Sequence, residues 1–424
     1  MRIERKFYLD QIRKFMLNGL VKVITGIRRC GKSYFLFNIF RDYLREAGVA
    51  DEQIIEVRLD EDEFEFLRNP RALSLYVKER LLSDGRQMYV LIDEIQECKP
   101  LEGDGVTFYD VLTTLMKKAD VYVTGSNSEM LSEDIATNFR DRGAVIRLWP
   151  LSFAEYYQIG GKEKSDAWED YLVWGGMPLA VLSPDQRSRE SYLKSLFGRV
   201  YFADIVERYS LKNEVALGAV CDVISSAIGG LTNAKRISDT LTTTAALSAC
   251  PQTVARYLEI LCRSFLFEKA LRYDVKGRKY LEGAAKYYCV DTGLRNARLN
   301  FRQIERTHLM ENVIYCELLR RGYSVDVGVV QTVEKDETGK SVRKELEIDF
   351  VVNSGFRRVY IQSALNIDDH GKLASEIRPF RKADDFFRRI VITGGNERLW
   401  QNEEGIVFVG VIPFLLEPDI LMGA

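Results

Sequence analysis

The sequence predicts an α/β fold that begins with a parallel, doubly wound sheet. Up to about residue 155, short apolar runs typical of strands alternate with helical patterns. A glycine-rich loop joins the first of these runs to a helix, and a later apolar run ends in two adjacent acids. Alternating strands and helices favour a parallel sheet, because a connection between parallel strands must cross over the sheet. Ligands of such sheets bind at the carboxyl ends of the strands.

The glycine-rich loop spans residues 26–33 and reads Gly-Ile-Arg-Arg-Cys-Gly-Lys-Ser. A predicted strand at 21–25 precedes it and a predicted helix at 34–40 follows it, which is the context that a phosphate-binding loop requires. Its glycines let backbone N–H groups approach phosphates, Lys32 reaches the β- and γ-phosphates, and Ser33 can ligate Mg²⁺. A plain glycine turn is the alternative, but it would not need Lys-Ser. The residues expected to contact ATP are Gly26, Ile27, Arg28, Arg29, Cys30, Gly31, Lys32, Ser33 and Tyr34.

A second predicted strand carries the two acids. Residues 88–92 are continuously apolar and are followed by Asp93 and Glu94, as in a central parallel strand that is buried on both faces. Asp93 is expected to hold Mg²⁺ through water, and Glu94 to polarise the attacking water as a general base. Two surface acids at the start of a loop are the alternative. The phosphate-binding loop ~60 residues upstream favours the catalytic interpretation.

Two further strands are predicted in this region, at 54–59 and at 121–124. A polar turn follows the second one, and its Asn127 is the candidate for orienting the lytic water, with Thr124 and Ser126 behind it. A turn that caps the next helix is the alternative.

Arginines follow in the next loop, where residues 139–143 read Phe-Arg-Asp-Arg-Gly. An arginine at this place, Arg140 or Arg142, would stabilise transition-state charge if it reached the γ-phosphate of a neighbouring subunit. We name Arg142 as the candidate. A solvated or salt-bridged loop arginine is the alternative.

Composition narrows the classes of protein further. The 424 residues predict two to four domains, and an apolar fraction of 46% with a charged fraction of 29% is typical of a soluble globular protein. The scattered cysteines predict reduced thiols and a cytoplasmic location. The formal net charge of −2 gives no overall basic signal for nucleic acid, and no apolar run is long enough to span a membrane. The seven cysteines lack CxxC spacing and the chain has two histidines, so a zinc site is not expected.

The predicted secondary structure changes in the middle of the chain. Residues 156–210 predict helices, and residues 211–290 predict three short helices and a hairpin, the order of a winged helix-turn-helix. The second stretch has 11 Lys and Arg against 7 Asp and Glu. DNA contact is the functional interpretation, and a protein-packing module is the alternative. The residues that would contact DNA are Gln252, Thr253 and Arg256 on the recognition helix, and Lys276, Arg278 and Lys279 in the wing.

The last part of the chain predicts a helix at 308–321, a polar loop, and strands at 345–352, 358–364 and 389–393. Over nearly its full length the chain closely resembles a widespread bacterial and archaeal group of ATPases. These have an AAA-type ATP-binding domain and a C-terminal domain known as DUF4143. The resemblance implies ATP binding by a domain related to archaeal and origin-recognition-like AAA ATPases. AAA-type relatives often work as rings, so a homo-oligomer is a candidate assembly. The segments that carry it are the phosphate-binding loop, residues 91–96, 123–127, 150–155, 175–178, 286–294 and 347–351.

The C-terminal region also resembles restriction-endonuclease-like nucleases, in which a helix Glu, a strand Asp and a Glu-x-Lys bind Mg²⁺ and activate water. Glu311 or Glu317 would match the helix acid, and Asp349 the strand acid. Gln362 stands at the position of the next acid and Ala364 at that of the lysine, so the metal would lose a ligand and the water its cation. We therefore expect a domain that binds without cutting. The alternative for Asp349 is an acid at a strand edge that pairs with Arg358.

These observations divide the chain into an ATPase core (1–155), a helical lid (156–210), a winged-helix-like domain (211–290) and a nuclease-like domain (291–424). The predicted function is hydrolysis of ATP with Mg²⁺, which drives a conformational switch on a partner, with DNA as a candidate. An ATP-responsive DNA-binding regulator without significant turnover is the alternative, and an active metal-dependent nuclease ranks third.

Overall fold

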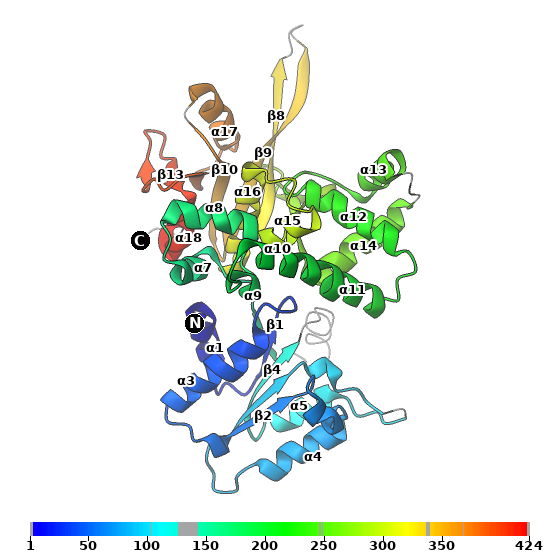
Figure 1. Cartoon of the computed structure of the whole chain (residues 1–424). Coiled ribbons are helices and arrows are strands. Elements are labelled where there is room, and N and C mark those ends of the chain that lie inside the picture. Colours follow the sequence, from blue (N-terminus) through cyan, green and yellow to red (C-terminus); the bar gives the residue numbers. More distant parts are fainter. Residues whose placement is uncertain are drawn as a thin grey trace. The chain divides into compact units, whose positions relative to one another are not determined.

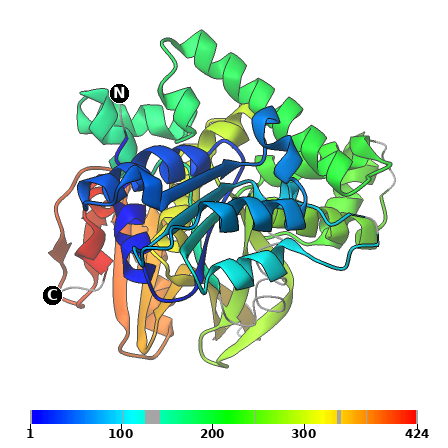
Figure 2. The same cartoon turned by 90° about the horizontal axis from the view of Figure 1, so that it is seen from below.

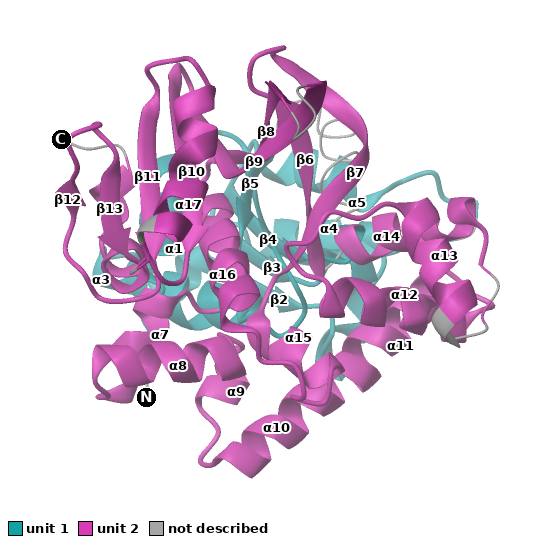
Figure 3. Cartoon of the chain, turned by 90° about the horizontal axis from the view of Figure 1, so that it is seen from above, with its two compact units in different colours: residues 1–150, 263–265 teal, residues 151–262, 266–424 magenta. Residues whose placement is uncertain are grey.

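The computed structural model describes residues 3–101, 103–125, 143–245, 247, 249–335, 340–367 and 369–421. The chain forms two compact units, which Figure 3 colours separately. Unit 1 consists of residues 1–150 and 263–265, and unit 2 of residues 151–262 and 266–424. Within the described ranges each unit contains one sheet, with five strands in unit 1 and eight in unit 2. Among the described residues no helix has the length and apolar character needed to cross a membrane.

The sheet of unit 1 is entirely parallel, with strand order β2-β3-β4-β1-β5. This confirms the predicted α/β fold with a parallel sheet. The strands are β1 (Val21–Thr25), β2 (Ile54–Arg58), β3 (Tyr89–Asp93), β4 (Asp120–Gly125) and β5 (Gly143–Arg147). Every residue of β1, β3 and β4 is buried, as continuous apolar runs predict for central strands. The edge strand β5 was not predicted.

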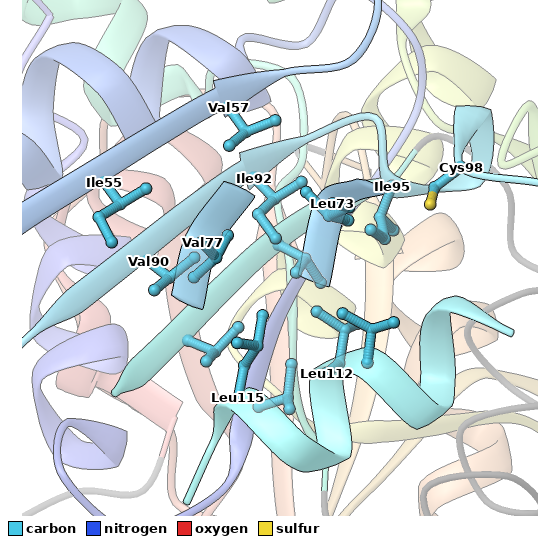
Figure 4. Packing of buried hydrophobic residues seen from close by; sticks show 14 of the residues in the cluster. Ile55, Val57, Leu73, Val77, Val90, Ile92, Ile95, Cys98, Leu112 and Leu115 are labelled. Carbon is cyan, nitrogen blue, oxygen red and sulfur yellow. The ribbon is translucent and has the colours of Figure 1, made fainter. Parts of the chain in front are cut away.

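Helices cover both faces of this sheet, so it is doubly wound (Figure 2). On one face, α4 (Pro70–Arg80) and α5 (Phe108–Leu115) pack on the sheet, where Val77 and Leu112 share one apolar cluster with Val57 and Ile92 (Figure 4). On the other face, the ring of Phe40 lies 4.4 Å from that of Tyr122 in β4. The remaining helical segments are α1 (Lys6–Phe15), α2 (Lys32–Tyr34), η1 (Phe35–Phe40), α3 (Arg41–Glu46), η2 (Asp51–Gln53), η3 (Asp62–Leu67) and η4 (Ile95–Glu97).

Unit 2 begins with helices, as predicted for this part of the chain. Aromatic side chains hold the first two together, with Phe153 packing edge-on against Trp168 at 5.6 Å. The segments are α7 (Phe153–Gly160), α8 (Lys164–Trp174), α9 (Pro178–Val181), α10 (Gln186–Ser195), η5 (Leu196–Phe202) and α11 (Ala203–Arg208). The break between α8 and α9 requires glycine, because a Cβ on Gly176 would lie 2.0 Å from the carbonyl oxygen of Leu151.

Three helices and an antiparallel hairpin follow, in the predicted order. They are α12 (Glu214–Ser226), α13 (Ala234–Ala245), α14 (Pro251–Arg263), β6 (Phe267–Asp274) and β7 (Lys279–Cys289). The hairpin is not isolated, because β6 also pairs in parallel with β8 (Ser324–Lys335). Strands from both sides of the predicted boundary at residue 290 therefore share one sheet, and that boundary stays a prediction.

The eight-stranded sheet has the order β12-β13-β11-β10-β9-β8-β6-β7. Strands β8 and β9 (Ser341–Ser354) form a long hairpin that extends beyond the rest of unit 2 (Figure 1). The prediction of a polar loop before residue 345 is wrong over 324–335, which form β8 with four buried valines, Val325, Val327, Val329 and Val330. The other segments are α15 (Thr292–Arg298), α16 (Arg306–Arg320), β10 (Arg357–Ala364), α17 (His370–Lys382), β11 (Arg388–Thr393), β12 (Trp400–Gln401), β13 (Val407–Gly410), α18 (Val411–Leu416) and η6 (Pro418–Leu421).

Candidate functional site

The glycine-rich loop connects β1 to the helix that starts at Lys32, at the carboxyl edge of the parallel sheet. Gly26 has φ 145°, and a Cβ there would lie 2.1 Å from the carbonyl oxygen of Leu148. Gly31 caps the helix with φ 99°. Both glycines therefore adopt backbone conformations that L side chains rarely tolerate, which shapes the loop into a cradle of backbone groups.

Lys32 is buried at the base of this loop. Its Nζ donates hydrogen bonds to the carbonyl oxygens of Gly26 at 3.1 Å and of Ile27 at 3.3 Å. The ammonium group is thus held beneath the loop by groups that do not carry a full charge. A phosphate in the loop would offer it a stronger, charge-assisted partner.

Asp93 ends β3 beside the loop, and only 2% of its surface is exposed. Its carboxylate accepts hydrogen bonds from the hydroxyls of Thr124 and Ser33. Burial raises the pKa of Asp93, the two hydrogen bonds lower it, and the nearby charges of Glu94 and Asp60 raise it, with a net upward shift. The structure therefore brings the two predicted magnesium ligands, Ser33 and Asp93, into direct contact. A hydroxyl and a carboxylate are oxygen ligands of the kind that Mg²⁺ prefers.

Glu94 follows directly in the left-handed conformation, with φ 47° and ψ 53°. Its backbone N–H donates to the Thr124 hydroxyl oxygen at 3.0 Å, and its carboxylate accepts a hydrogen bond from the side-chain amide of Gln96. Strained conformations of non-glycine residues are frequent at functional sites, where the surrounding structure holds them in place. Here Thr124 and Gln96 together orient the candidate general base.

Several candidates of this region lie outside the described residues. These are Ser126, Asn127, Arg140 and Arg142, so their roles stay predictions. Thr124 itself is fully buried and directs its hydroxyl to Asp93, which makes it a positioning residue.

The other residues of the loop differ in exposure. Ile27 and Cys30 are buried, whereas Arg29 and Tyr34 are exposed and Arg28 is half-buried. Burial raises the pKa of the Cys30 thiol, although the charges of Lys32, Arg5 and Arg147 oppose this. Arg29 adopts φ 64°, so its backbone also enters the left-handed region.

The candidate DNA-contacting cations of unit 2 are exposed. Arg256 lies on α14, and Lys276, Arg278 and Lys279 lie at the turn between β6 and β7. Within the described parts of the chain, none of these four has a carboxylate oxygen within 4.0 Å. Gln252 and Thr253 lie on the first turn of α14.

The acids of the nuclease-like region lie around one buried lysine, Lys286 of β7. Its Nζ is 2.7 Å from Glu347, 2.9 Å from Glu311 and 3.8 Å from Asp349. Burial lowers the pKa of Lys286, but the charges of the three acids outweigh this and raise it. Burial and the charge of Glu311 raise the pKa of Asp349 well above its usual range. The lysine is thus the internal cation of this cluster. Lys286 and Glu347 also line a cavity of about 870 Å³ in unit 2.

The structure separates the two candidate helix acids, Glu311 and Glu317. Glu317 does not join the cluster, because it pairs with Arg320 and Arg321 at 2.6 and 2.7 Å. Burial opposes its ionisation, but these charges outweigh burial and lower the pKa of Glu317. The alternative for Asp349, a pairing with Arg358, is wrong, since Arg358 donates to Asn353.

The next strand brings Gln362 to the cluster. Its Oε1 accepts from the backbone N–H of Asp349 at 3.4 Å, and its amide donates to Glu376 at 3.0 Å. Ala364 is buried on the same strand and carries no cation. Across the described residues, no group of three or more His, Cys, Asp and Glu side chains is arranged to hold a metal ion.

Sequence reasoning missed two positioning roles. Gln96 and Lys286 both lie in segments that carry the family resemblance, yet nothing local indicates their partners. Lys286 contacts acids that follow it by 25, 61 and 63 residues in the chain, since they lie at 311, 347 and 349. A buried lysine in a strand, which rarely occurs without a partner, was the available signal.

Comparison with known proteins agrees with this architecture. A family model described as "AAA domain" matches residues 18–157, and one described as "Domain of unknown function (DUF8612)" matches residues 165–305. The predicted DUF4143 assignment and the winged helix stay predictions. A solved structure of the Aeropyrum pernix ORC1 protein in complex with DNA covers 71% of this chain and 93% of that chain at 16% identity, but its TM-score of 0.29 adds nothing to the assignment.

Two relatives cover most of the chain. An uncharacterized protein of Methanocaldococcus jannaschii is 26% identical over 388 residues, which are 87% of this chain and 79% of that protein. An uncharacterized protein of Haemophilus influenzae is 31% identical over 424 residues, which are 98% of this chain and 99% of that protein. The chain therefore belongs to the same family as this Haemophilus influenzae protein, and its N-terminal part has an AAA-type P-loop fold.

Proposed function

We propose that this chain binds ATP with Mg²⁺ and hydrolyses it, and that turnover drives a conformational switch on a partner. The observation that carries the proposal is the contact of Ser33 with Asp93, beside the buried Lys32. These groups fit a metal–triphosphate: two oxygen ligands, one cation and a glycine cradle at the carboxyl edge of a parallel sheet.

The residues have distinct tasks in this proposal. Lys32 exchanges its loop carbonyls for the β- and γ-phosphates, while Ser33 and Asp93 hold the ion. Bound Mg²⁺ neutralises charge on the phosphate oxygens. Glu94, oriented by Thr124 and Gln96, accepts a proton from the attacking water.

The first experiment separates binding from hydrolysis. Wild-type protein and the variants Lys32→Ala and Glu94→Gln are compared for binding of a fluorescent ATP analogue and for phosphate release. We expect K32A to lose binding, and E94Q to retain it while turnover falls by ~10²-fold or more. Glu97→Gln, which changes a carboxyl in the short helix that Glu94 precedes, serves as the matched control and should keep both. Absence of specific ATP binding by the wild type would contradict the proposal.

The second candidate function is an ATP-responsive DNA-binding regulator without significant turnover. The exposed cations Arg256, Lys276 and Lys279 support it, since no described carboxylate neutralises them within 4.0 Å. Duplex DNA binding should then weaken steeply as salt rises. Unchanged DNA affinity after charge reversal at these three positions would remove the support. Binding of ATP without phosphate release would favour this candidate over the first.

The remaining proposals concern assembly and cleavage. We propose that Arg142 acts in trans if the chain forms a homo-oligomer, which the protein's mass in solution with and without ATP would test. We expect no metal-dependent cleavage of DNA, because Lys286 already neutralises the acids that a metal would need. DNA that is cut with Mg²⁺ or Mn²⁺ by the wild type, but not by Asp349→Ala, would contradict this expectation.

A further inference from the structure

Two identical tripeptides lie side by side at one end of the eight-stranded sheet. Residues 356–358 and 387–389 both read Phe-Arg-Arg, and each lies where a strand begins. The strands, β10 and β11, pair in parallel with Val359 opposite Arg388 (Figure 3). The residues that precede both strands are therefore neighbours at the same sheet end. They belong to unit 2 and take no part in the proposed ATP site, whose residues belong to unit 1.

The aromatic side chains at this end are unusually exposed. Phe356 has 93% of its surface exposed, and Phe386, next to the second tripeptide, is fully exposed. Burying a phenylalanine is favourable, so two neighbouring phenylalanines in water need a reason beyond this chain's own packing. Their planar faces are available to a partner.

The arginines at this end lack the acidic partners that other arginines of unit 2 have. Arg378 pairs with Glu334 and Arg381 with Glu404. In contrast, the four tripeptide arginines have no carboxylate within 4.0 Å among the residues that the structure describes. These four are Arg357, Arg358, Arg388 and Arg389.

These arginines contact aromatic rings and backbone oxygens instead, and neither kind of group neutralises their charge. Arg358 lies 5.0 Å from the ring centre of Tyr273 and 5.3 Å from that of Phe387. Arg388 and Arg389 donate to backbone carbonyl oxygens, which carry no net charge. Arg357 is exposed beside Phe356.

Acids also lie near this sheet end. Asp385 is engaged, because its carboxylate accepts a hydrogen bond from Tyr360 at 2.6 Å, and Asp384 is exposed. Asp326 and Glu404 also feel the charges of Arg358 and Arg389, but Glu404 already pairs with Arg381, and neither acid lies within 4.0 Å of a tripeptide arginine.

We infer that this sheet end, formed by Phe356, Phe386 and the four tripeptide arginines, binds a single-stranded polynucleotide. Exposed phenylalanines offer stacking faces to unpaired bases, and arginines without acidic partners offer charge to the phosphates between them. Neighbouring strands lie about 4.8 Å apart, so the two phenylalanines can stack on the bases of closely spaced nucleotides. A duplex would hide its base faces from these side chains, and therefore a single strand is preferred.

The test uses the full-length protein and a fluorescent oligothymidylate of ~20 nucleotides in an anisotropy titration. The double variant Phe356→Ala/Phe386→Ala should weaken binding by ~10-fold or more, since each stacked base contributes substantially. Phe66→Ala, which removes an exposed phenylalanine of unit 1, is the matched control and should leave binding unchanged. Because all three side chains are largely exposed, the melting temperatures should stay close to that of the wild type.

A second variant tests the charge. Arg357→Glu should weaken binding and reduce the slope of log affinity against log salt by ~0.7, the value for one phosphate contact on a single strand. Lys32→Ala should retain oligonucleotide binding, so that failure of this inference and failure of the ATP proposal are distinguishable. The inference is overturned if the wild type does not bind the oligonucleotide, or if the loss follows Arg256→Glu rather than the phenylalanines. Binding to vesicles with ~30% anionic lipid, but not to the oligonucleotide, would also overturn it.

Discussion

The backbone N–H of Gly176 donates a 2.6 Å hydrogen bond to the Asp291 carboxylate, across 115 residues of chain. The same carboxylate caps α15 by accepting from the N–H of Leu294 at 2.9 Å. It lies so close to Gly175 that a Cβ there would be 2.3 Å from its oxygen. One buried acid therefore joins the glycine break after α8 to the start of α15 within unit 2.

Removal of this acid should destabilise the protein strongly. Asp291→Ala leaves a buried N–H of Gly176 without a partner and removes a helix cap, which together should lower the free energy of unfolding by about 3 kcal/mol. Chemical denaturation of the full chain measures the change. Asp185→Ala provides the comparison, because Asp185 caps α10 at an exposed position and its loss should cost about 1 kcal/mol. Equal effects of the two substitutions would show that burial of Asp291 does not matter.

The same acid predicts a pH dependence. Burial raises the pKa of Asp291 to about 6, although the backbone N–H groups of Gly176, Leu294 and Gly293 oppose this. In the unfolded chain the pKa of an aspartate is about 3.9. Because the folded value is the higher one, the stabilising contribution is complete below pH ~4 and is lost as pH rises towards ~6.

Asp291→Asn isolates this contribution, since asparagine resembles the protonated acid and does not titrate. We expect the free energy of unfolding of the wild type, minus that of D291N, to fall between pH ~4 and ~6.5. Denaturation curves over this range measure it, and other titrating groups cancel in the difference. A difference that rises with pH would mean that the hydrogen bonds outweigh burial.

Long apolar runs made much of unit 1 predictable. The strand expected at 21–25 coincides with β1, and the run at 88–92 lies almost entirely within β3. Both are central strands, in which burial on each face removes the polar residues that obscure a pattern. The edge strand β5, which is as long as β1, was missed because its burial is mixed. Strand β8 was missed because polar residues such as Asp326 and Gln331 interrupt its run of valines.

Side-chain partners were harder to predict than strands. The loop glycines and the acids after β3 were found because their chemistry depends on neighbours in the sequence. The partners of Lys286 and Asp291 lie far along the chain, so only the folded arrangement brings them together. Both side chains are buried, and a buried charge needs a partner that local sequence does not reveal.

Replacing Lys286 should destabilise the protein, because the acids around it would lose their compensating charge. Lys286→Met leaves Glu311, Glu347 and Asp349 without their shared cation, and loss of one member of a buried ion pair costs about 3–5 kcal/mol. Adding Glu311→Gln to this variant should recover part of the loss, because one buried charge is then removed. Denaturation of the single and double variants measures the coupling. If the two effects add without recovery, the cluster does not act as one electrostatic unit.

Gly26 should be intolerant of any side chain. With φ 145° and a Cβ that would meet the carbonyl oxygen of Leu148 at 2.1 Å, Gly26→Ala must displace the loop or the segment directly after β5. We expect affinity for a fluorescent ATP analogue to fall by ~10-fold or more, since 1 Å displacements disrupt such sites. Gly19→Ala is the matched control, because Gly19 also has positive φ but has open space around its Cβ position. Retained affinity in G26A would show that the loop can shift without losing the phosphates.

Thr124 should control hydrolysis without controlling ATP binding. Its hydroxyl donates to Asp93 and accepts from the N–H of Glu94, so Thr124→Val removes both contacts while preserving the shape of the side chain. We expect kcat to fall by ~10²-fold with a small change in KM, because Lys32 and the loop still hold the phosphates while the general base is misplaced. Thr124→Ser keeps the hydroxyl and should restore most of the rate, which a purely structural role for the methyl group would not allow. A large rise in KM with unchanged kcat would instead place Thr124 in nucleotide binding.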